Sequence, residues 1–579
     1  MICAFFSRLF STHITAQPID LASGDWKLKT GDDITWATPQ YDDSDWQNIR
    51  VGMDLKTALN TDFTGFSWYR RSVLIPSKLK KAAQKGGAMI LHLGKITDAD
   101  ETYFNGIKVG YNGSFPPDTV SAWEVPRVYI IPLNLIKWDE PNVIAVRVNN
   151  WFSGGGMYMG EYMIEAATWR NKFKILIENG SKTHAFDKNE PIIIHSQLAN
   201  SSTDRLEGTL TCEIKIFMGQ SVATKSQEVK ILRGRVVKAE SFNFDTLEAG
   251  FYISHFTFKD KNGTSFKEKK GFAVAPETLK IPATPPPDFD EFWDKALKEL
   301  AEIEPNYQLT LLPKWTTSEV EVFELEMKSL GNVRVKGYYS RPKGKKNLPA
   351  VLNVQGYSSV MEPFDSDTNM AAVYLNIRGH GNSREDINPG FPGFLLRGLE
   401  NKENYIYRGA YMDCVRAVDF LCSRAEVDTS RLAVSGGSQG GALSIATASL
   451  DKRIKFCLPD VPFLSDFPNY FKIANWPFEE FKQYVSRTGT SWDSIYSVLN
   501  YIDIKNHAPR ITCPVIMASC LFDDICPSAI NFAAFNNLSS LEKAFYLYPE
   551  SGHSVPAEHH ALKMQIGRAS CRERVCMLV

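Results

Sequence analysis

One short stretch limits what this chain can fold into: the sequence V-S-G-G-S-Q-G-G at residues 434–441. An apolar, strand-like run precedes it, and a run of small residues suited to a helix, 442–448, follows it. A serine on so sharp a turn needs neighbours without side chains two positions away on either side, and Gly436 and Gly440 occupy those positions. The stretch therefore predicts a strand–turn–helix unit with Ser438 exposed above the end of its strand.

The predicted turn has a chemical consequence. It presents the hydroxyl group of Ser438, and it aims the backbone N–H of Gln439, at the start of the predicted helix, toward an anion beside that hydroxyl. A glycine-rich turn that only packs a helix against a strand has the same sequence pattern. The interpretation of Ser438 as a nucleophile therefore depends on finding a base and an acid elsewhere in the chain.

Candidates for both partners follow late strand-like runs. Asp523 and Asp524 come shortly after the apolar run 514–519, and His553 comes shortly after the run 544–548. Nucleophile, acid and base in this order along the chain, with each residue near the end of a strand, are typical of α/β-hydrolases. The order and the context indicate a catalytic triad, with either aspartate as the acid.

The composition limits the partners that we expect. The 579 residues suffice for about three or four domains. A formal net charge of -1 without a basic stripe argues against nucleic acid as a partner. No apolar run is long enough to cross a bilayer, and the 10 cysteines show no C-x-x-C pairing. The sequence therefore predicts no membrane partner, no metal site and no cofactor.

Residues 1–19 have features of a signal segment. The chain begins with an apolar run that Arg8 interrupts, and a T-x-A sequence before Gln17 suits a small-residue cleavage site. We therefore expect a periplasmic or secreted protein, with a distorted or missing start of the sequence as the alternative.

Residues 20–169 have the pattern of an all-β domain. Strand-like runs such as 88–93 and 143–148 alternate with turn-rich loops, and N-G at 105–106 marks a hairpin. Together with W-Y-R at 68–70, this pattern resembles the galactose-binding-like jelly roll at the front of β-galactosidase-type glycosidases. The resemblance leaves open whether the domain is a scaffold or binds a sugar.

The pattern stays β through residues 170–278, where half-buried runs such as 252–258 favour an immunoglobulin-like sandwich. A proline-rich linker follows. From there, strand–helix alternation over residues 279–565 predicts an α/β domain with a largely parallel sheet. The spacing of Asp288 and Glu291 predicts a capping box at the start of the first helix of this domain.

The α/β segment resembles one family in detail. Residues 288–565 are similar to the acetyl xylan esterase/cephalosporin-C deacetylase family of α/β-hydrolases. The shared motifs lie at residues 288–293, 355–357, 378–381, 405–408, 436–441, 523–527 and 552–553. The resemblance implies that the nucleophile is Ser438, the acid Asp523 and the base His553. It also implies an oxyanion hole made by the backbone N–H groups of Gln439 and Tyr357, and it implies no metal and no cofactor.

The chain departs from the family pattern in three places. His380 stands where members usually have a glutamine, and Ser528 stands where they usually have a second proline after Pro527. Two β domains also precede the hydrolase, where many members have none. The ring-shaped hexamer of the family is therefore not carried over, and a homo-oligomer remains one alternative. The partner that the resemblance implies is an acetylated oligo- or polysaccharide.

Residues 566–579 do not continue the pattern. The stretch 566–575 has no periodicity suited to a helix, and it resembles the translation of a sequencing-adapter oligonucleotide. We expect the native sequence to end near Gln565, with an ordinary basic tail as the alternative.

Taken together, the triad and the resemblance predict a three-domain carbohydrate esterase that removes acetyl groups from xylan-derived or related sugars. A broad carboxylesterase or a serine peptidase on the same fold is one alternative, because fold and triad are shared among these activities. A non-catalytic carbohydrate-binding protein is the second, and the presence of all three triad residues argues against it.

Overall fold

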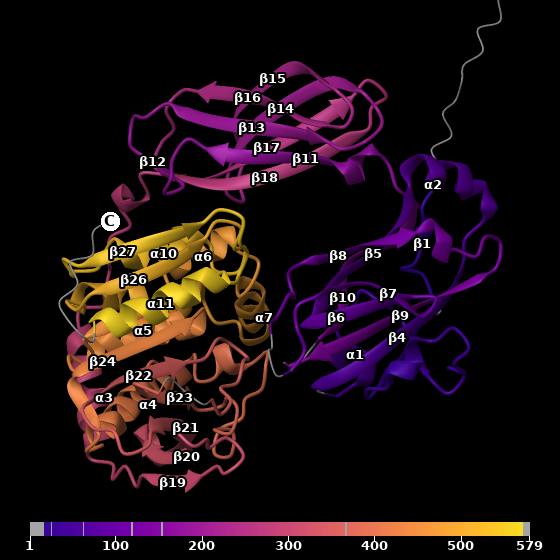
Figure 1. Cartoon of the computed structure of the whole chain (residues 1–579). Coiled ribbons are helices and arrows are strands. Elements are labelled where there is room, and N and C mark those ends of the chain that lie inside the picture. Colours follow the sequence, from indigo (N-terminus) through magenta and orange to yellow (C-terminus); the bar gives the residue numbers. More distant parts are fainter. Residues whose placement is uncertain are drawn as a thin grey trace, which may run out of the picture. The chain divides into compact units, whose positions relative to one another are not determined.

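The computed structural model describes residues 17–24, 26–61, 63–116, 120–151, 155–364 and 368–570 (Figure 1). Most of the expected signal segment, residues 1–16, and the last residues, 571–579, lie outside this part. By contacts the chain forms two compact units, of which the first comprises Met1–Lys174 with the short segments Ala199–Leu206 and Ile231–Val237. No helix of the described residues is both long and apolar enough to cross a membrane.

The first unit contains two antiparallel sheets. The smaller sheet has the order β1 (Ile19–Asp20), β10 (Gly156–Ala166), β5 (Ala88–Thr97), β8 (Pro126–Pro132). The larger has the order β3 (Gln47–Ile49), β2 (Trp26–Thr30), β4 (Gly65–Leu74), β9 (Pro141–Asn150), β6 (Ala99–Phe104), β7 (Ile107–Asn112). Two short helices, α1 (Leu55–Leu59) and α2 (Lys80–Gly86), complete the unit. Its core contains buried side chains from both sheets, among them Tyr69, Leu91 and Phe104.

The N-G hairpin expected in this unit is confirmed. Asn105 and Gly106 join β6 to β7, and both have positive φ, at 50° and 83°. A two-residue turn with positive φ at both positions matches the right-handed twist of the strands that it joins.

The middle of the chain is also β, as expected. One sheet has the order β11 (Phe173–Asn179), β13 (Ile192–Asn200), β16 (Arg235–Phe244). The other has the order β12 (Ala185–Phe186), β18 (Ser265–Val274), β17 (Gly250–Asp260), β14 (Leu206–Ile216), β15 (Ser221–Ile231). Burial alternates along β14, which is the period of a half-buried strand. Most of these strands group with the second unit, so the boundaries expected at 169 and 278 stay predictions.

The first helix of the α/β domain, α3 (Phe289–Ala301), buries Phe289, Phe292, Trp293, Ala296 and Leu300, as the helical spacing requires. The expected capping box is wrong. Asp288 makes no capping hydrogen bond, because its carboxylate instead accepts hydrogen bonds from Lys402 and Tyr501.

The second unit is built around a sheet of nine strands. Its order is β19 (Gln308–Leu311), β20 (Val320–Ser329), β21 (Val333–Pro342), β23 (Ala371–Asn376), β22 (Leu348–Val354), β24 (Val427–Gly437), β25 (Phe456–Asp460), β26 (Val515–Cys520), β27 (Lys543–Tyr548). The six strands from β23 to β27 in this order are mutually parallel, which confirms the α/β prediction. Their carboxyl ends share one edge, where α/β proteins place their sites.

Helices connect the parallel strands, and a final helix follows β27. They are α4 (Ile406–Cys422), α5 (Gln439–Leu450), α6 (Phe467–Ile473), α7 (Phe478–Thr488), α8 (Trp492–Ile502), α9 (Ile504–His507), α10 (Ser528–Phe535) and α11 (Ala557–Ser570). Both α4 and α5 pack against β22 and β24 and against each other. The end of α11 corrects one expectation, because residues 566–570 are helical although their sequence shows no helical period. The origin of the tail stays a prediction.

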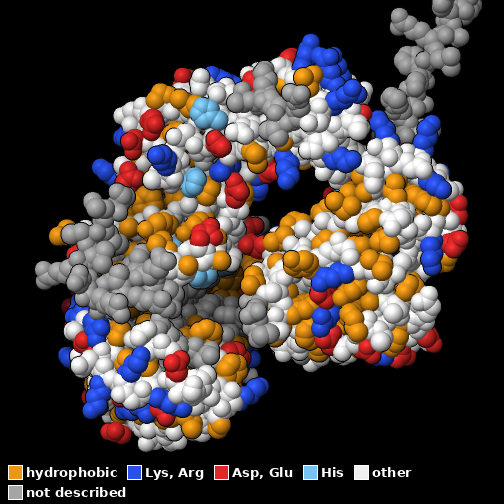
Figure 2. All heavy atoms as spheres, in the orientation of Figure 1, with side chains coloured by type: hydrophobic (Ala, Val, Ile, Leu, Met, Phe, Trp, Pro, Cys, Tyr) orange, Lys and Arg blue, Asp and Glu red, His pale blue; other side chains and the backbone are white. Residues whose placement is uncertain are grey.

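Side chains of both charges occur on each unit over the face shown in Figure 2.

Candidate active site

Ser438 lies on a strained turn between β24 and α5. Its φ is 58°, a left-handed conformation that costs an L-residue free energy and that is typical of a nucleophile elbow. A Cβ atom at Gly436 would lie 2.6 Å from the carbonyl carbon of Gly440, and one at Gly440 would lie 2.2 Å from the carbonyl oxygen of Val354. Neither position tolerates a side chain, which confirms the steric argument from the sequence. The Ser438 N–H donates to the carbonyl of Asp460 at 2.9 Å, which holds the turn on β25.

The structure brings the three predicted triad residues together at the carboxyl edge of the sheet. The Nε2 atom of His553 lies 2.9 Å from the Oγ of Ser438, and its Nδ1 atom lies 2.8 Å from the Oδ2 of Asp523. Since a carboxylate only accepts, Nδ1 carries the proton, and Nε2 is the acceptor for the serine hydroxyl. Asp524, the alternative acid, is exposed, whereas Asp523 is fully buried.

Asp523 is held in place from both sides. Its Oδ1 accepts the backbone N–H of Ile525 at 3.0 Å and that of Cys526 at 2.7 Å, in addition to the imidazole. These bonds fix the carboxylate, and the carboxylate in turn fixes the ring of His553.

The protonation of His553 follows from this setting. Burial by itself lowers the pKa of an imidazole, but the charge of Asp523 outweighs it and raises the pKa of His553 well above its ordinary value of 6.5. An imidazole so placed has a strong tendency to take up the proton that a serine hydroxyl gives up on attack.

The two predicted oxyanion donors come from neighbouring strands. Val354 of β22 lies opposite Gly436 of β24 in this parallel pair. Tyr357 comes three residues after Val354, and Gln439 comes three residues after Gly436. Gln439 is the first residue of α5, where backbone N–H groups have no partner within the helix. Both candidates therefore lie beside the serine turn.

The side chain of Gln439 belongs to a buried network that the sequence did not reveal. Its Oε1 accepts the hydroxyl of Tyr407 at 2.7 Å, and its amide lies 3.2 Å from Nε2 of His380. Burial lowers the pKa of His380 to about 3, so the ring is neutral and Nε2 accepts the amide proton. His380 thus provides the acceptor that a glutamine would offer at this position, and the departure from R-G-Q-G was the only signal in the sequence.

Cys526 also lies within the site. Its Sγ is 3.9 Å from the Oγ of Ser438, and burial raises the pKa of its thiol. Potential metal-ligand atoms of Asp523, Cys526 and His553 lie within 4.8 Å of one another, and no other such group of three occurs among the described residues. In the sequence, this cysteine stands out only as part of the motif at residues 523–527.

Aromatic rings from the segments beside α6 and α7 connect the serine turn to the loop that carries Tyr357. The N–H of Phe463 donates to the carbonyl of Ser438 at 3.0 Å, and its ring stacks on Trp476 at 5.2 Å between centroids. Trp476 in turn contacts the ring of Tyr357 at 5.1 Å. The rings of Phe463 and Trp476 therefore link the turn of Ser438 to the loop of Tyr357.

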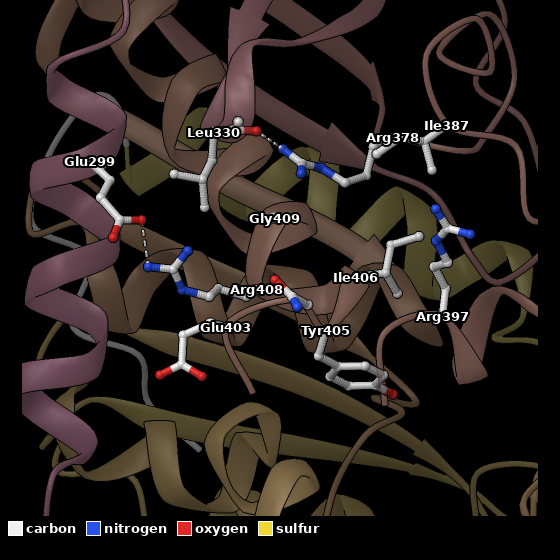
Figure 3. A pocket seen from close by; sticks show the side chains of 12 residues that line it. Glu299, Leu330, Arg378, Ile387, Arg397, Glu403, Tyr405, Ile406, Arg408 and Gly409 are labelled. Atoms are coloured by element: carbon white, nitrogen blue, oxygen red, sulfur yellow. Dashed lines mark hydrogen bonds and ion pairs between the residues drawn. The ribbon is translucent and has the colours of Figure 1, made fainter. Parts of the chain in front are cut away.

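A separate cavity lies at the start of α4 (Figure 3). Two of its arginines are already engaged, because Arg378 donates to the carbonyl of Leu330 and to Asp413, and Arg408 pairs with Glu299 at 2.7 Å. No triad residue lines this cavity, so it is not the place where the candidate chemistry occurs.

The parallel sheet, the strained serine before α5 and the hydrogen-bonded chain through His553 to Asp523 are typical of the class of α/β-hydrolases. Comparison with known proteins gives the family within this class. Residues 277–566 match the family described as acetyl xylan esterase (AXE1). The chain belongs to this family, and it is a carboxylic-ester hydrolase of the carbohydrate-esterase type.

Individual relatives match different parts of the chain. Acetyl esterase Axe7A from Xylanibacter ruminicola is 30% identical over 360 residues, which are 59% of this chain and 79% of that protein. The solved structure of an acetyl xylan esterase from Paenibacillus sp. R4 is 33% identical, with 51% of this chain and 98% of that one covered and a TM-score of 0.48. The β-galactosidase BoGH2A from Bacteroides ovatus is 26% identical over 162 residues, 24% of this chain and 17% of that protein. The chain is thus a multidomain protein with a β-rich N-terminal part and an esterase-like C-terminal domain.

Proposed function

We propose that this chain hydrolyses O-acetyl esters of xylan-derived or related sugars, with Ser438 as nucleophile, His553 as base and Asp523 as the residue that orients the base. The observation that carries the proposal is the continuous hydrogen-bonded chain from Asp523 through His553 to Ser438, at 2.8 and 2.9 Å. The family supports acetyl as the acyl group, since the relatives are named as acetyl esterases or acetyl xylan esterases.

In the first half-reaction, the hydroxyl of Ser438 attacks the acetyl carbonyl while Nε2 of His553 takes its proton. Asp523 stabilises the imidazolium that forms. We assign the N–H groups of Gln439 and Tyr357 to the oxyanion, where losing one donor typically costs about a hundred- to a thousandfold in rate. The C–O bond to the sugar then breaks, and the sugar oxygen leaves with the proton from His553.

In the second half-reaction, water replaces the sugar. His553 takes a proton from the water as it attacks the acetyl-serine, and the same proton then returns to the Oγ of Ser438 as acetate leaves. The cycle is complete without any change of oxidation state.

The same proposal includes the types of the two β regions, the location of the protein and its assembly. The two β regions would be a galactose-binding-like jelly roll and an immunoglobulin-like sandwich, each supported by two β-sheets in the corresponding part of the chain. An acetylated polysaccharide as substrate fits a periplasmic or secreted enzyme. A homo-oligomer remains an open part of the proposal.

The experiment measures acetate release from acetylated xylo-oligosaccharides and from an aryl acetate, for the wild type and for Ser438→Ala. Removal of a triad nucleophile should lower kcat by about a millionfold while the fold is retained. Cleavage of both esters by the wild type, lost in the variant, supports the proposal. Cleavage of the aryl ester alone would replace it with a broad carboxylesterase, cleavage of peptide substrates would favour a serine peptidase, and a folded wild type inactive on all substrates would overturn it.

A further inference from the structure

The thiol of Cys526 adds a soft donor to the oxygen and nitrogen donors of the candidate triad. Its Sγ lies 3.9 Å from the Oγ of Ser438, and that Oγ lies 2.9 Å from Nε2 of His553. Ser438 and His553 are only partly buried, whereas Cys526 is fully buried behind them, so a small ion would approach the sulfur past the other two side chains. The triad mechanism itself gives the thiol no role.

The spacing of these atoms suits a tetrahedral metal ion. Zinc lies about 2.3 Å from thiolate sulfur and about 2.0–2.1 Å from imidazole nitrogen, which places neighbouring ligands roughly 3.6 Å apart. Potential ligand atoms of Cys526 and His553 lie within 4.8 Å of each other, and the Oγ of Ser438 lies 3.9 Å from Sγ and 2.9 Å from Nε2.

The surroundings of His553 also match a metal-ligating imidazole. Such a histidine almost always donates its other ring N–H to a carboxylate or carbonyl, which fixes the tautomer and increases the basicity of the ligating nitrogen. Nδ1 of His553 makes this contact with Asp523 at 2.8 Å. The backbone N–H groups of Ile525 and Cys526 hold the carboxylate in turn, so the supporting layer of the site is already complete.

We propose that the candidate active site binds a thiophilic divalent cation, Zn²⁺ or Cd²⁺, through Sγ of Cys526, Nε2 of His553 and Oγ of Ser438, and that this cation inhibits the esterase. Thiolate and imidazole ligands select such ions over Mg²⁺ and Ca²⁺, which prefer oxygen. Binding releases the thiol proton of Cys526 to solvent and changes no oxidation state. The ion occupies the lone pair of Nε2 that the reaction uses, so the metal-bound enzyme cannot deprotonate a nucleophile.

The test begins with inhibition. Hydrolysis of an aryl acetate is measured at increasing Zn²⁺, with Mg²⁺ as the comparison ion, for the wild type, Cys526→Ala and Cys422→Ala. Each rate is compared with that of the same variant in the presence of a chelator. Cys422 is a half-buried thiol elsewhere in the same domain and serves as the matched control.

The expected effect is large. Loss of a hydrogen-bond partner behind a metal ligand costs about 10- to 100-fold in metal affinity, so loss of the sulfur ligand itself should raise the half-inhibiting Zn²⁺ concentration by at least about 100-fold. Cys422→Ala should remain as sensitive as the wild type.

A direct binding measurement does not depend on the activity or on its substrate. Cd²⁺ added to the wild type should produce the ultraviolet charge-transfer band of a cadmium thiolate, and this band should be absent from Cys526→Ala. Zn²⁺ should also slow the reaction of Ser438 with a sulfonyl fluoride, a measurement that uses only the wild type and therefore holds if the cysteine variant does not fold. Equal inhibition of wild type and Cys526→Ala, a missing cadmium band in the wild type, or unchanged sulfonylation would each overturn the proposal.

Discussion

Two buried carboxylates, one in each unit, belong to hydrogen-bond networks of different kinds. One network is structural, and the other belongs to the candidate active site. In the first unit, Asp100 of β6 accepts hydrogen bonds from Arg127 and Tyr129 of β8, at 2.7 and 2.8 Å, and the Arg127–Asp100 pair is fully enclosed. In the second unit, the hydrogen-bonded chain that starts at Asp523 ends at Ser438, a residue that is only partly buried.

The difference lies in the last member of each network. The bonds of Asp100 join strands of the two different sheets of the first unit, and its partners all lie within that unit. The Asp523 network lies at the carboxyl edge of a parallel sheet, and its last member, Ser438, is only partly buried. A closed network holds layers together, whereas an open one can pass a proton to a molecule that arrives from outside.

Replacement of Asp523, the carboxylate of the open network, should have the largest effect on activity. Asp523→Asn keeps the size of the side chain, but it removes the charge that stabilises the imidazolium and favours the wrong tautomer of His553. In serine hydrolases this substitution lowers kcat by about ten-thousandfold. The measurement is kcat for aryl acetate hydrolysis. Asp524→Asn is the matched control, since Asp524 is exposed, and it should stay within a few-fold of the wild type. Equal losses in the two variants would contradict the assignment of Asp523 as the orienting acid.

Replacement in the closed network should affect stability instead of catalysis. Arg127→Met leaves the carboxylate of Asp100 buried without its charge partner, and breaking a buried pair in this way costs about 3–5 kcal/mol in the free energy of unfolding. The urea transition of the first unit should move accordingly, while kcat of the folded protein stays unchanged.

The double variant Arg127→Met, Asp100→Asn supplies the control for this second prediction. Without the unpaired charge, most of the lost stability should return, because the penalty arises from the isolated carboxylate. If the double variant is no more stable than Arg127→Met, the pair does not act as described.

The sequence predicted the open network better than the closed one, for a physical reason. The turn around Ser438 depends on Gly436 and Gly440, which are close to it in the chain, and the order of Asp523 and His553 follows the order of the strands. The Asp100–Arg127 pair joins two different sheets, so alternation along either strand gives no sign of it. The capping box at Asp288 failed for a related reason, because Lys402, far away in sequence, competes for the carboxylate.

The contacts of His380 lay beyond sequence reasoning in the same way. Its ring meets the amide of Gln439 from α5, which also receives the hydroxyl of Tyr407 from α4, so three distant segments converge. His380→Leu removes the nearer of the two acceptors of the Gln439 amide, since the other, the carbonyl of Gly356, lies at 3.5 Å, and a buried N–H left unpaired costs about 1–3 kcal/mol in stability. Because the backbone of the same residue is the candidate oxyanion donor, kcat should also fall, by roughly tenfold for about 1.4 kcal/mol of lost transition-state stabilisation.

His380→Gln distinguishes positioning from packing. The glutamine oxygen can accept the same amide proton, so this variant should recover most of the kcat that His380→Leu loses. Equal kcat values for the two variants would mean that the ring acts only through its volume.

The smallest expected effect is a shift in the midpoint of the pH profile of kcat/KM. Replacement of Asp523 should cause this shift, whereas replacement of Arg127 should not. His553 must be neutral to accept the serine proton, so kcat/KM rises with pH through the pKa of His553 and is lost as pH falls below it. Because Asp523 raises that pKa well above 6.5, the acid limb of the wild-type profile should have its midpoint above pH 6.5. Asp523→Asn removes the charge that raises the pKa of His553 and leaves the burial that lowers it, so the midpoint of the residual activity should move to lower pH. Arg127→Met should leave the midpoint in place, because Asp523, which raises the pKa of His553, is unchanged in this variant. A profile of Asp523→Asn that keeps the wild-type midpoint would show that the carboxylate does not set the proton affinity of His553, and the distinction between an open and a closed network would then rest on exposure alone.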